Sequence, residues 1–245
     1  MSQTLEHRVD VAITTDDGGA HDVFHCDPIA CHASTPQQAA ADYLRSHAAL
    51  IRLPGAGGAA GSGPYGLCFE AEHTLFDTVT VSYEQTYDGI AVWRRGAAVQ
   101  LHTEPLRVVR ARSTARDDIL VRRPSQTSML DRLTADADDV VDTLGLTADA
   151  LSYTRSTAES RSVTVLKRRT VIFRYDEATR VRPSAQGAVL PSPVPAAIRD
   201  GADRVAVETT VQVGVGPHSL AWLVLSDVET GTVLYVEPFV APSWP

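Results

Sequence analysis

The residue types best suited to chemistry gather in one short segment near the start of the chain. Within twelve residues lie three histidines and two cysteines, namely His21, His25, Cys26, Cys31 and His32. Imidazole nitrogens and thiolates at short spacing are the groups from which zinc sites are built. The segment contains no CxxC pair, however, and two histidines four residues apart share a face only on a helix.

Gly18, Gly19 and Pro28 all oppose a helix, so the sequence predicts a non-helical backbone for this segment. We therefore favour a surface loop with incidental histidines over a metal site, and we expect no cofactor. The zinc ligands that remain as weaker candidates are His25, Cys26, Cys31 and His32.

Sequence patterns of hydrolytic enzymes are absent. Neither HExxH nor GxSxG occurs, and the neighbours His218 and Ser219 imply no catalytic geometry by adjacency alone. The glycine-rich stretch 54–66 follows a predicted helix and opens none, so we interpret it as a flexible linker and not as a dinucleotide site. The residues thus favour a protein without catalytic groups.

Composition narrows the function classes further. The 245 residues include 22 Lys+Arg against 30 Asp+Glu, a net charge of −8, which disfavours general nucleic-acid binding. No apolar run approaches the roughly 20 residues of a membrane span. The first residues carry no signal-peptide pattern, so a cytoplasmic location is the default expectation. With three cysteines a disulfide framework is not expected, although a Cys26–Cys31 pair stays open for an oxidising compartment.

Charge is distributed unevenly along the chain. Arginines are frequent from 107 to 123, and aspartates from 131 to 142. These opposite blocks are neighbours in sequence, so we favour a match between them within the molecule over a patch for an acidic partner.

Two helices and a series of strands are predicted. Thr35, Pro36 and Gln38 form a capping-box start for a helix over 36–50, and the strands of 78–113 follow, with Asp88-Gly89 as a two-residue hairpin turn. A second helix is expected over 129–145, ending at Gly145. Further strands are expected near 8–14, 151–155, 162–175, 205–215, 219–226 and 232–240.

This order predicts an α+β fold of two helix-plus-antiparallel-meander modules, cystatin-like or PepSY-like. The expected divisions are an N-terminal strand and polar loop at 1–33, a helix and sheet at 34–120, and a second helix and sheet at 121–245.

Two motifs resemble the proregions of thermolysin- and fungalysin-type metalloproteases. Gln85, Tyr87, Gly89 and Val92 stand where that propeptide family has Gln-x-Tyr-x-Gly-x-x-Val. The stretch 220–238 is similar to the PepSY-type module that follows in those proregions, with matches at Asp227, Thr230, Gly231, Val233 and Leu234. The protease domain with HExxH is missing from this sequence, and the insert 176–203 departs from the family pattern.

The resemblance implies a non-catalytic protein that docks its first sheet onto a metalloprotease as an inhibitor or folding assistant. The partner-binding residues would then be Gln85, Tyr87, Gly89 and Val92. A docking module for an unrelated protein is the alternative. A small-molecule enzyme with a cavity between helix and sheet is a third hypothesis, which only the histidine–cysteine segment supports. Neither nucleic acid nor membrane is an expected partner.

Overall fold

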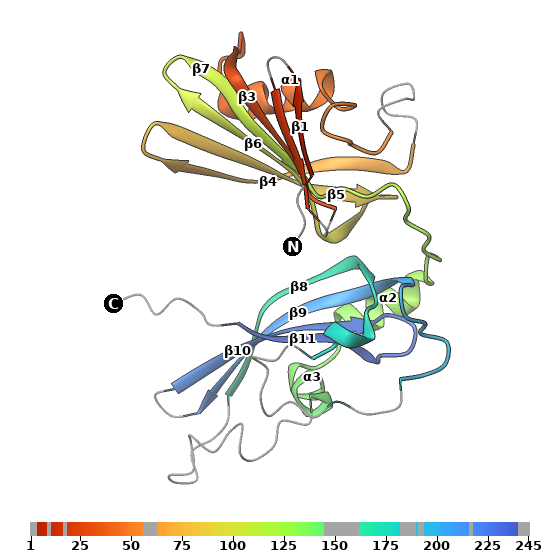
Figure 1. Ribbon diagram of the computed structural model, residues 1–245. Helices are drawn as coiled ribbons and strands as arrows, with labels where there is room; N and C mark the ends of the chain where they lie inside the picture. The colour runs from red at the N-terminus through yellow and green to blue at the C-terminus, as the bar shows by residue number, and fades with distance from the viewer. Residues whose placement is uncertain are drawn as a thin grey trace. The chain divides into compact units, whose positions relative to one another are not determined.

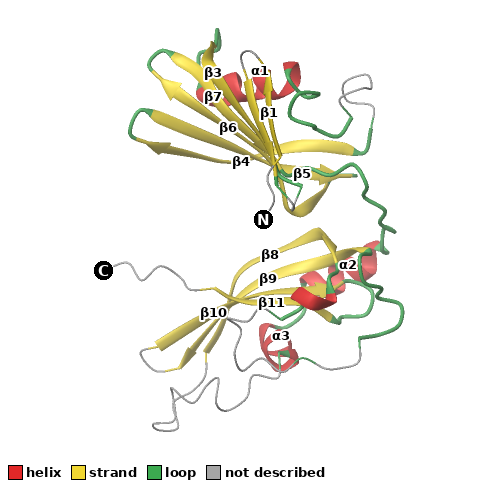
Figure 2. Cartoon of the chain, in the orientation of Figure 1, coloured by secondary structure: helices red, strands yellow, loops and turns green. Residues whose placement is uncertain are grey.

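The computed structural model describes residues 4–8, 11–16, 19–55, 63–144, 162–181, 190, 194–215 and 218–239. These residues belong to two compact units, Met1–Ile119 and Leu120–Pro245. Figure 1 shows the elements of each unit, and Figure 2 shows how strongly strands predominate over helices. Of the described residues, 53% lie in strands and 15% in helices.

The first unit contains an antiparallel sheet in the order β1-β2-β3-β7-β6-β5-β4. Three strands precede the helix and four follow it. Their bounds are β1 Thr4–Arg8, β2 Val11–Thr15, β3 His21–Ala30, β4 Tyr65–Leu75, β5 Thr78–Tyr87, β6 Ile90–Thr103 and β7 Leu106–Ser113.

Helix α1, Pro36–Ser46, covers one face of this sheet. The Thr35 hydroxyl accepts from the Gln38 N–H at 3.2 Å, which satisfies an amide at the helix start as the sequence predicts. Ala40 and Leu44 pack with Val81 and Val99 of the sheet, all of them nearly inaccessible to solvent. The helix ends at Ser46 and not at residue 50 as expected, and Ile51 joins the core from the turn that follows.

The second unit contains the antiparallel sheet β8-β9-β10-β11. The strands are β8 Ser162–Arg174, β9 Asp203–Val215, β10 His218–Asp227 and β11 Val233–Phe239, and a short 3-10 helix, η2, spans Glu177–Thr179. The core of this unit includes Val211, Trp222, Val224 and Val236, packed with Val141.

A single helix was expected over 129–145, but two short helices are found, α2 Gln126–Leu133 and α3 Ala137–Thr143. The break follows from local hydrogen bonds. The Thr134 hydroxyl donates to the Leu130 carbonyl at the end of α2, and the Asp136 carboxylate accepts from the Asp138 N–H at the start of α3. The Arg168 guanidinium donates to the Ala135 carbonyl between them.

The predicted fold of two helix-plus-meander modules is therefore wrong, since the molecule is mostly sheet with short helices. The N-terminal segment, expected as one strand and a polar loop, contributes β1, β2 and β3 to the first sheet. No strand was expected for β4, Tyr65–Leu75. Its first two residues belong to the stretch 54–66 that was interpreted as a flexible linker, so that interpretation is wrong there, and residues 56–62 lie outside the described residues. The expected strand at 151–155 falls outside the described residues.

Two arginines of the stretch 107–123 pair with carboxylates of the N-terminal segment. Arg110 contacts the Asp22 carboxylate at 2.8 Å, and Arg112 lies 3.7 Å from that of Asp16, so both pair with the N-terminal strands and the turn between β2 and β3. Cross-strand pairing of β7 with β3 explains this choice, because Asp22 lies directly opposite Arg112 in the register.

Candidate functional site

Two surface features of the first unit stand out, a β-hairpin with an apolar tip and a pocket beside α1. The hairpin consists of β4 and β5, joined by the two-residue turn Phe76-Asp77. Among the described strands β4 pairs only with β5, so its other side is a sheet edge. Such an edge presents backbone N–H and C=O groups to which a further chain can pair.

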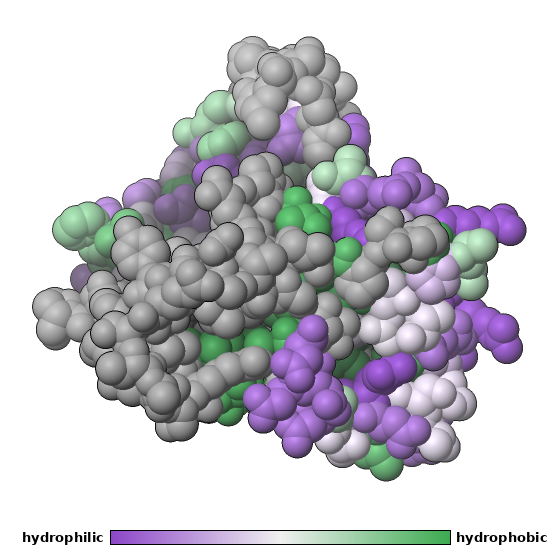
Figure 3. Space-filling view, turned by 90° about the horizontal axis from the view of Figure 1, so that it is seen from below, coloured by the Kyte–Doolittle hydropathy of each residue, from purple (hydrophilic) through white to green (hydrophobic). Residues whose placement is uncertain are grey.

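The tip of this hairpin exposes large apolar side chains. Leu75 is 67% exposed and Phe76 is 92% exposed, and Phe69 lies further along β4 at 46%. Among the described residues of the second unit, the exposed large apolar residues are single ones far apart in sequence, at Leu120, Leu130, Leu166 and Val181. In Figure 3, hydrophilic side chains cover much of the coloured surface and hydrophobic ones show in smaller areas. The neighbouring apolar residues at the hairpin tip therefore indicate a binding surface more strongly than single exposed apolar residues do.

Phe76 has an unusual backbone, with φ at 54° in the left-handed region. A bulky side chain is rarely found there, and the conformation costs free energy that the surroundings must offset. Hydrogen bonds hold the turn in place: the Thr78 hydroxyl donates to the Leu75 carbonyl at 2.9 Å. The Asp77 carbonyl accepts from the N–H and the hydroxyl of Thr103, at 3.0 and 3.1 Å. These contacts fix the backbone of the turn from which the Phe76 side chain projects.

The residues predicted to bind a partner lie on the next hairpin, β5–β6. Gln85 and Val92 are each 1% exposed, whereas Tyr87 is half-buried and Gly89 is exposed in the turn. Gln85 has a structural partner: its side-chain amide donates to the Arg116 carbonyl at 2.6 Å and accepts from the Arg116 N–H at 3.0 Å. Gly89 has φ at 78°, which the two-residue turn requires. Whether these residues contact a partner remains a prediction.

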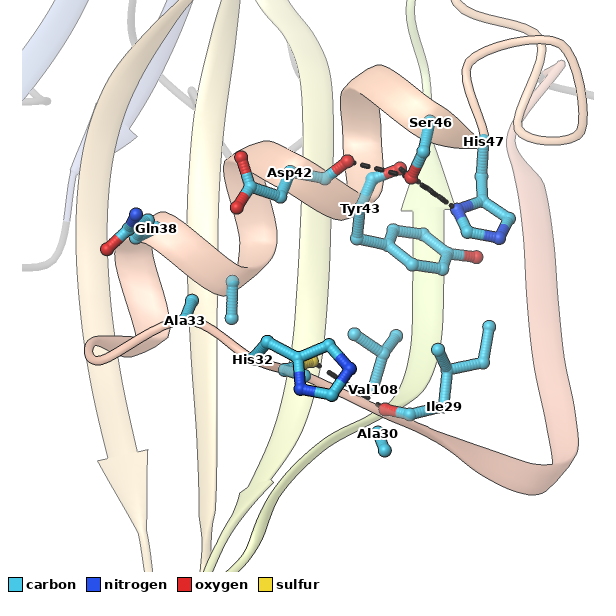
Figure 4. Close-up of a pocket in the computed structure, with 12 residues that line it drawn as sticks. Ile29, Ala30, His32, Ala33, Gln38, Asp42, Tyr43, Ser46, His47 and Val108 are labelled. Carbon is cyan, nitrogen blue, oxygen red and sulfur yellow. Dashed lines mark hydrogen bonds between the residues drawn. The ribbon is translucent and has the colours of Figure 1, made fainter.

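The second feature is a pocket of about 300 Å³ between α1 and the end of β3. Figure 4 shows Asp42, Ser46 and His47 on the helix side and His32, Ile29 and Val108 on the opposite side. The pocket brings together two of the predicted zinc candidates, Cys31 and His32.

The other two zinc candidates lie elsewhere. His25 is held by α1, because its Nε2 is 2.7 Å from the Tyr43 hydroxyl. Cys26 is exposed. None of the three cysteines, Cys26, Cys31 and Cys68, forms a disulfide. Within the described part of the chain, no group of three or more His, Cys, Asp and Glu side chains could hold a metal ion.

Burial shifts the pKa values of three side chains around the pocket, His25, Cys31 and Tyr43. Desolvation lowers the pKa of His25, and the nearby His47 lowers it further. Desolvation also raises the pKa of the Tyr43 hydroxyl. The pKa of Cys31 is raised chiefly by burial, against a hydrogen bond with the Val108 backbone that lowers it, and the Asp42 charge raises it again. Cys31 is thus a neutral thiol and a poor nucleophile at neutral pH.

Ser46 and His47 resemble part of a catalytic triad, but their contacts belong to the helix end. The Ser46 hydroxyl lies 2.8 Å from the Asp42 carbonyl and 2.9 Å from His47 Nδ1, and His47 Nδ1 lies 3.2 Å from the Tyr43 carbonyl. The Asp42 carboxylate accepts from Arg45 at 2.9 Å. An activated serine needs an imidazole that takes its proton and a carboxylate that orients that imidazole. Ser46 and His47 are in contact, but no carboxylate among the described residues is hydrogen-bonded to His47.

The sequence reasoning missed the β4 hairpin. The pattern that could have found it is the alternation of Tyr65, Leu67, Phe69 and Ala71, which is typical of a strand. An exposed Leu-Phe pair at a turn has no such sequence pattern, because only the strand register shows that residues 76 and 77 form the turn.

Comparisons with known proteins give little further guidance. No family model matches the chain, and no curated protein matches it. The Bacillus megaterium YpeB C-terminal domain, a PepSY-containing protein, is a weak structural neighbour. It has 9% sequence identity and a TM-score of 0.36, over 98% of this chain and 89% of that chain. No family assignment follows from a similarity at this level. No helix among the described residues is long and apolar enough to cross a membrane.

Proposed function

We propose that this protein is a non-catalytic docking module that binds a partner protein through the β4–β5 hairpin. The observation that carries the proposal is the tip, where Phe76 is 92% exposed in a left-handed backbone conformation. An exposed aromatic side chain with only two side-chain torsions loses little conformational entropy when it enters a socket on a partner. The left-handed conformation belongs to the two-residue turn, and it places an aromatic residue at the tip of the hairpin.

The open edge of β4 adds a second mode of contact. An extended segment of the partner extends the sheet by pairing with β4, while its socket receives Leu75 and Phe76. Glu70, Glu72 and Asp77 are exposed along the edge and at the turn, so the partner surface carries basic groups next to an apolar socket.

The proposed partner class is a thermolysin-like metalloprotease domain, with this chain acting as its inhibitor or folding assistant. The support for this finer proposal is the sequence resemblance of residues 85–92 and 220–238 to protease proregions. Docking without catalysis also agrees with the raised pKa of the Cys31 thiol.

The decisive variant is Phe76→Asn. Asparagine tolerates the left-handed backbone, so the turn should fold, while the aromatic contact is removed. We expect the wild-type chain to inhibit a thermolysin-type protease and the variant to inhibit it about tenfold less well, as for the loss of an interface hot spot. Residual protease activity against increasing concentrations of each chain measures this.

Leu120→Gln is the matched control, because Leu120 is 85% exposed and lies in the second unit. Its inhibition should equal that of the wild type. No inhibition by the wild-type chain at high micromolar excess would rule out the metalloprotease as partner. Inhibition that Phe76→Asn leaves intact would instead rule out the hairpin as the docking surface.

If the partner is an unrelated protein, the same hairpin variant identifies it. A protein retained from lysate by the wild-type chain and by Leu120→Gln, but not by Phe76→Asn, is the expected finding under that alternative. Retention by all three chains would contradict docking through the tip.

A further inference from the structure

The pocket beside α1 is lined mostly by apolar side chains, and its volume of about 300 Å³ is at the low end of the range for small-molecule sites. Val108 and Ala39 in its lining belong to the core of the first unit. Ile29 and Ala33 are partly buried and pack against that core. In Figure 4 the Tyr43 ring extends from α1 toward Val108 and Ile29. A molecule between the ring and these two side chains would therefore remove apolar surface from water.

Two polar groups of the lining, the Cys31 thiol and the Tyr43 hydroxyl, already have partners within the protein. The thiol donates to the Ile29 carbonyl, with 3.6 Å between sulfur and oxygen, and the hydroxyl lies 2.7 Å from His25 Nε2. Desolvation raises the pKa of Cys31 and of Tyr43 and lowers that of His25, so all three side chains are uncharged at neutral pH. The protein around this part of the pocket therefore disfavours charge.

The polar groups at the end of α1 are paired as well. The Ser46 hydroxyl lies 2.8 Å from the Asp42 carbonyl and 2.9 Å from His47 Nδ1. The Asp42 carboxylate is 2.9 Å from Arg45, and the Asp42 side chain is 53% exposed. Because water and Arg45 already stabilise this negative charge, a ligand gains little by pairing with it.

The rest of the lining offers no group that would hold an ion. Asp42 is the single carboxylate among the residues that line the pocket, and neither lysine nor arginine is among them. His32 and Gln38, the remaining polar residues of the lining, are exposed, so water can satisfy their hydrogen bonds. A charged ligand would give up part of its hydration and gain no buried ion pair in return.

We propose that this pocket binds a small uncharged molecule that consists mainly of hydrocarbon. The hydrocarbon part lies between the Tyr43 ring and the side chains of Ile29 and Val108. Binding depends on the removal of apolar surface from water, and the ligand needs no ion pair with the protein.

A series of primary alcohols, 1-butanol, 1-pentanol and 1-hexanol, is the probe, and protein NMR of the full chain at about pH 7 is the measurement. We expect saturable shifts of the backbone amides in residues 29–33 and 38–47. The affinity should rise about fourfold for each added CH₂ group, as expected when that group is buried.

Ions with the same hydrocarbon chain test the preference for an uncharged ligand. Hexanoate and hexylammonium should each bind about tenfold more weakly than 1-hexanol, because both lose hydration and neither finds a free opposite charge. Asp42→Asn removes the carboxylate without changing its shape, and it should leave the affinity for 1-hexanol unchanged.

Cys31 gives an independent measurement, because a ligand in the pocket covers its thiol. Saturating 1-hexanol should slow the alkylation of Cys31 by iodoacetamide at least fivefold, as measured by mass spectrometry of peptides. Cys26 and Cys68 are exposed and do not line the pocket, so their alkylation rates should stay unchanged.

Ala33→Leu fills part of the pocket and should weaken 1-hexanol binding about tenfold. Ser34→Leu is the matched control, because it adds the same side chain at an exposed neighbouring position that does not line the pocket. Its affinity for 1-hexanol should equal that of the wild type. Unchanged amide shifts outside residues 29–47 show that each variant is folded.

Four results would overturn the proposal. They are the absence of both saturable shifts and Cys31 protection with 1-hexanol, an affinity that does not rise with chain length, binding of hexylammonium or hexanoate as tight as that of 1-hexanol, and a folded Ala33→Leu variant that binds as the wild type does. None of them bears on the docking hairpin, because the pocket and the hairpin share no residue.

Discussion

His21 and His25 lie on the same strand, and both are held by the surrounding structure. His21 is 3% exposed; its Nε2 is 3.0 Å from the Leu50 carbonyl and its Nδ1 is 3.0 Å from the Thr15 hydroxyl. The first contact requires a hydrogen on Nε2, so Nδ1 accepts from Thr15. His25 fastens β3 to α1 through Tyr43. These histidines therefore act in packing, where sequence suggested incidental residues on a loop.

His25 should make folding sensitive to mild acid. Burial, and then His47, lower its pKa in the folded state below the ordinary value of 6.5. The unfolded chain thus binds the proton more readily. The stability contributed by neutral His25 is complete above about pH 6.5 and is lost as the pH falls toward the folded-state pKa. Urea unfolding of the wild type at a series of pH values should show this loss.

His25→Gln is the comparison, because glutamine does not titrate. The difference in unfolding free energy between wild type and variant should shrink as the pH falls below about 6.5. NMR titration of the His25 ring gives an independent reading. A difference that is constant from neutral pH downward, together with an ordinary His25 pKa, would contradict the account.

At the scale of elements, the sequence predicts the features that neighbouring residues determine, namely a helix start and a hairpin turn. Helix α1 begins where Thr35 and Pro36 require it, and the hairpin turns at Asp88-Gly89, with Tyr87 opposite Ile90. Strand β3 was missed because Pro28 and the polar residues around it argue against a strand. The register of β3 with β7 shifts between Phe24 and Ile29. Pro28 lies within this irregularity, where no backbone N–H is needed for a hydrogen bond between the strands.

The candidate site was harder to predict than the helix starts. Gln85 was expected to meet a partner because its identity matched a motif, yet its side chain holds Arg116 inside the unit. Phe76 carries no motif, and its exposure depends on strand pairing between Leu75 and Thr78. The Gln85 case depends on a contact between distant parts of the chain, and the Phe76 case depends on the register of one hairpin; single-sequence patterns contain neither.

Strands β5 and β6 approach each other closely at Gly96, and this predicts the effect of a substitution there. A Cβ atom at this position would lie 2.0 Å from the Tyr83 carbonyl oxygen and 3.1 Å from the Glu84 Cα. Backbone atoms cannot yield as a flexible side chain can, so Gly96→Ala must displace β5 from β6. We expect a loss of about 2–3 kcal/mol in the free energy of unfolding, measured by urea denaturation.

Gly63→Ala is the control for Gly96→Ala, because a Cβ at Gly63 meets nothing within 4 Å. Its stability should stay within about 0.5 kcal/mol of the wild type or rise slightly. If both substitutions cost the same, the effect would be that of losing a glycine in general, and the close approach of β5 would not be its cause.

At the scale of the whole molecule, each unit has its own core and the connecting segment is attached on both sides. Arg116 is bound to Gln85, and the Tyr65 hydroxyl donates to the Asp117 carbonyl, so the segment up to this point belongs to the first sheet. The Leu120 N–H donates to the Asp203 carboxylate at 3.0 Å, which places Leu120 in the second unit. The change from one unit to the other thus takes about three residues.

Two separate cores should respond separately to damage. Leu101 is fully buried in the core of the first unit, and Leu101→Ala should cost about 2–5 kcal/mol there through the cavity it leaves. Hydrogen exchange of the full chain, followed by mass spectrometry of its peptides, should show faster exchange in β5, β6 and β7. Protection in β9 and β10, whose Val211 and Val224 pack in the other core, should stay unchanged. Equal loss of protection in all five strands would mean that the chain unfolds as one cooperative body, and the division at residues 119 and 120 would then have no energetic meaning.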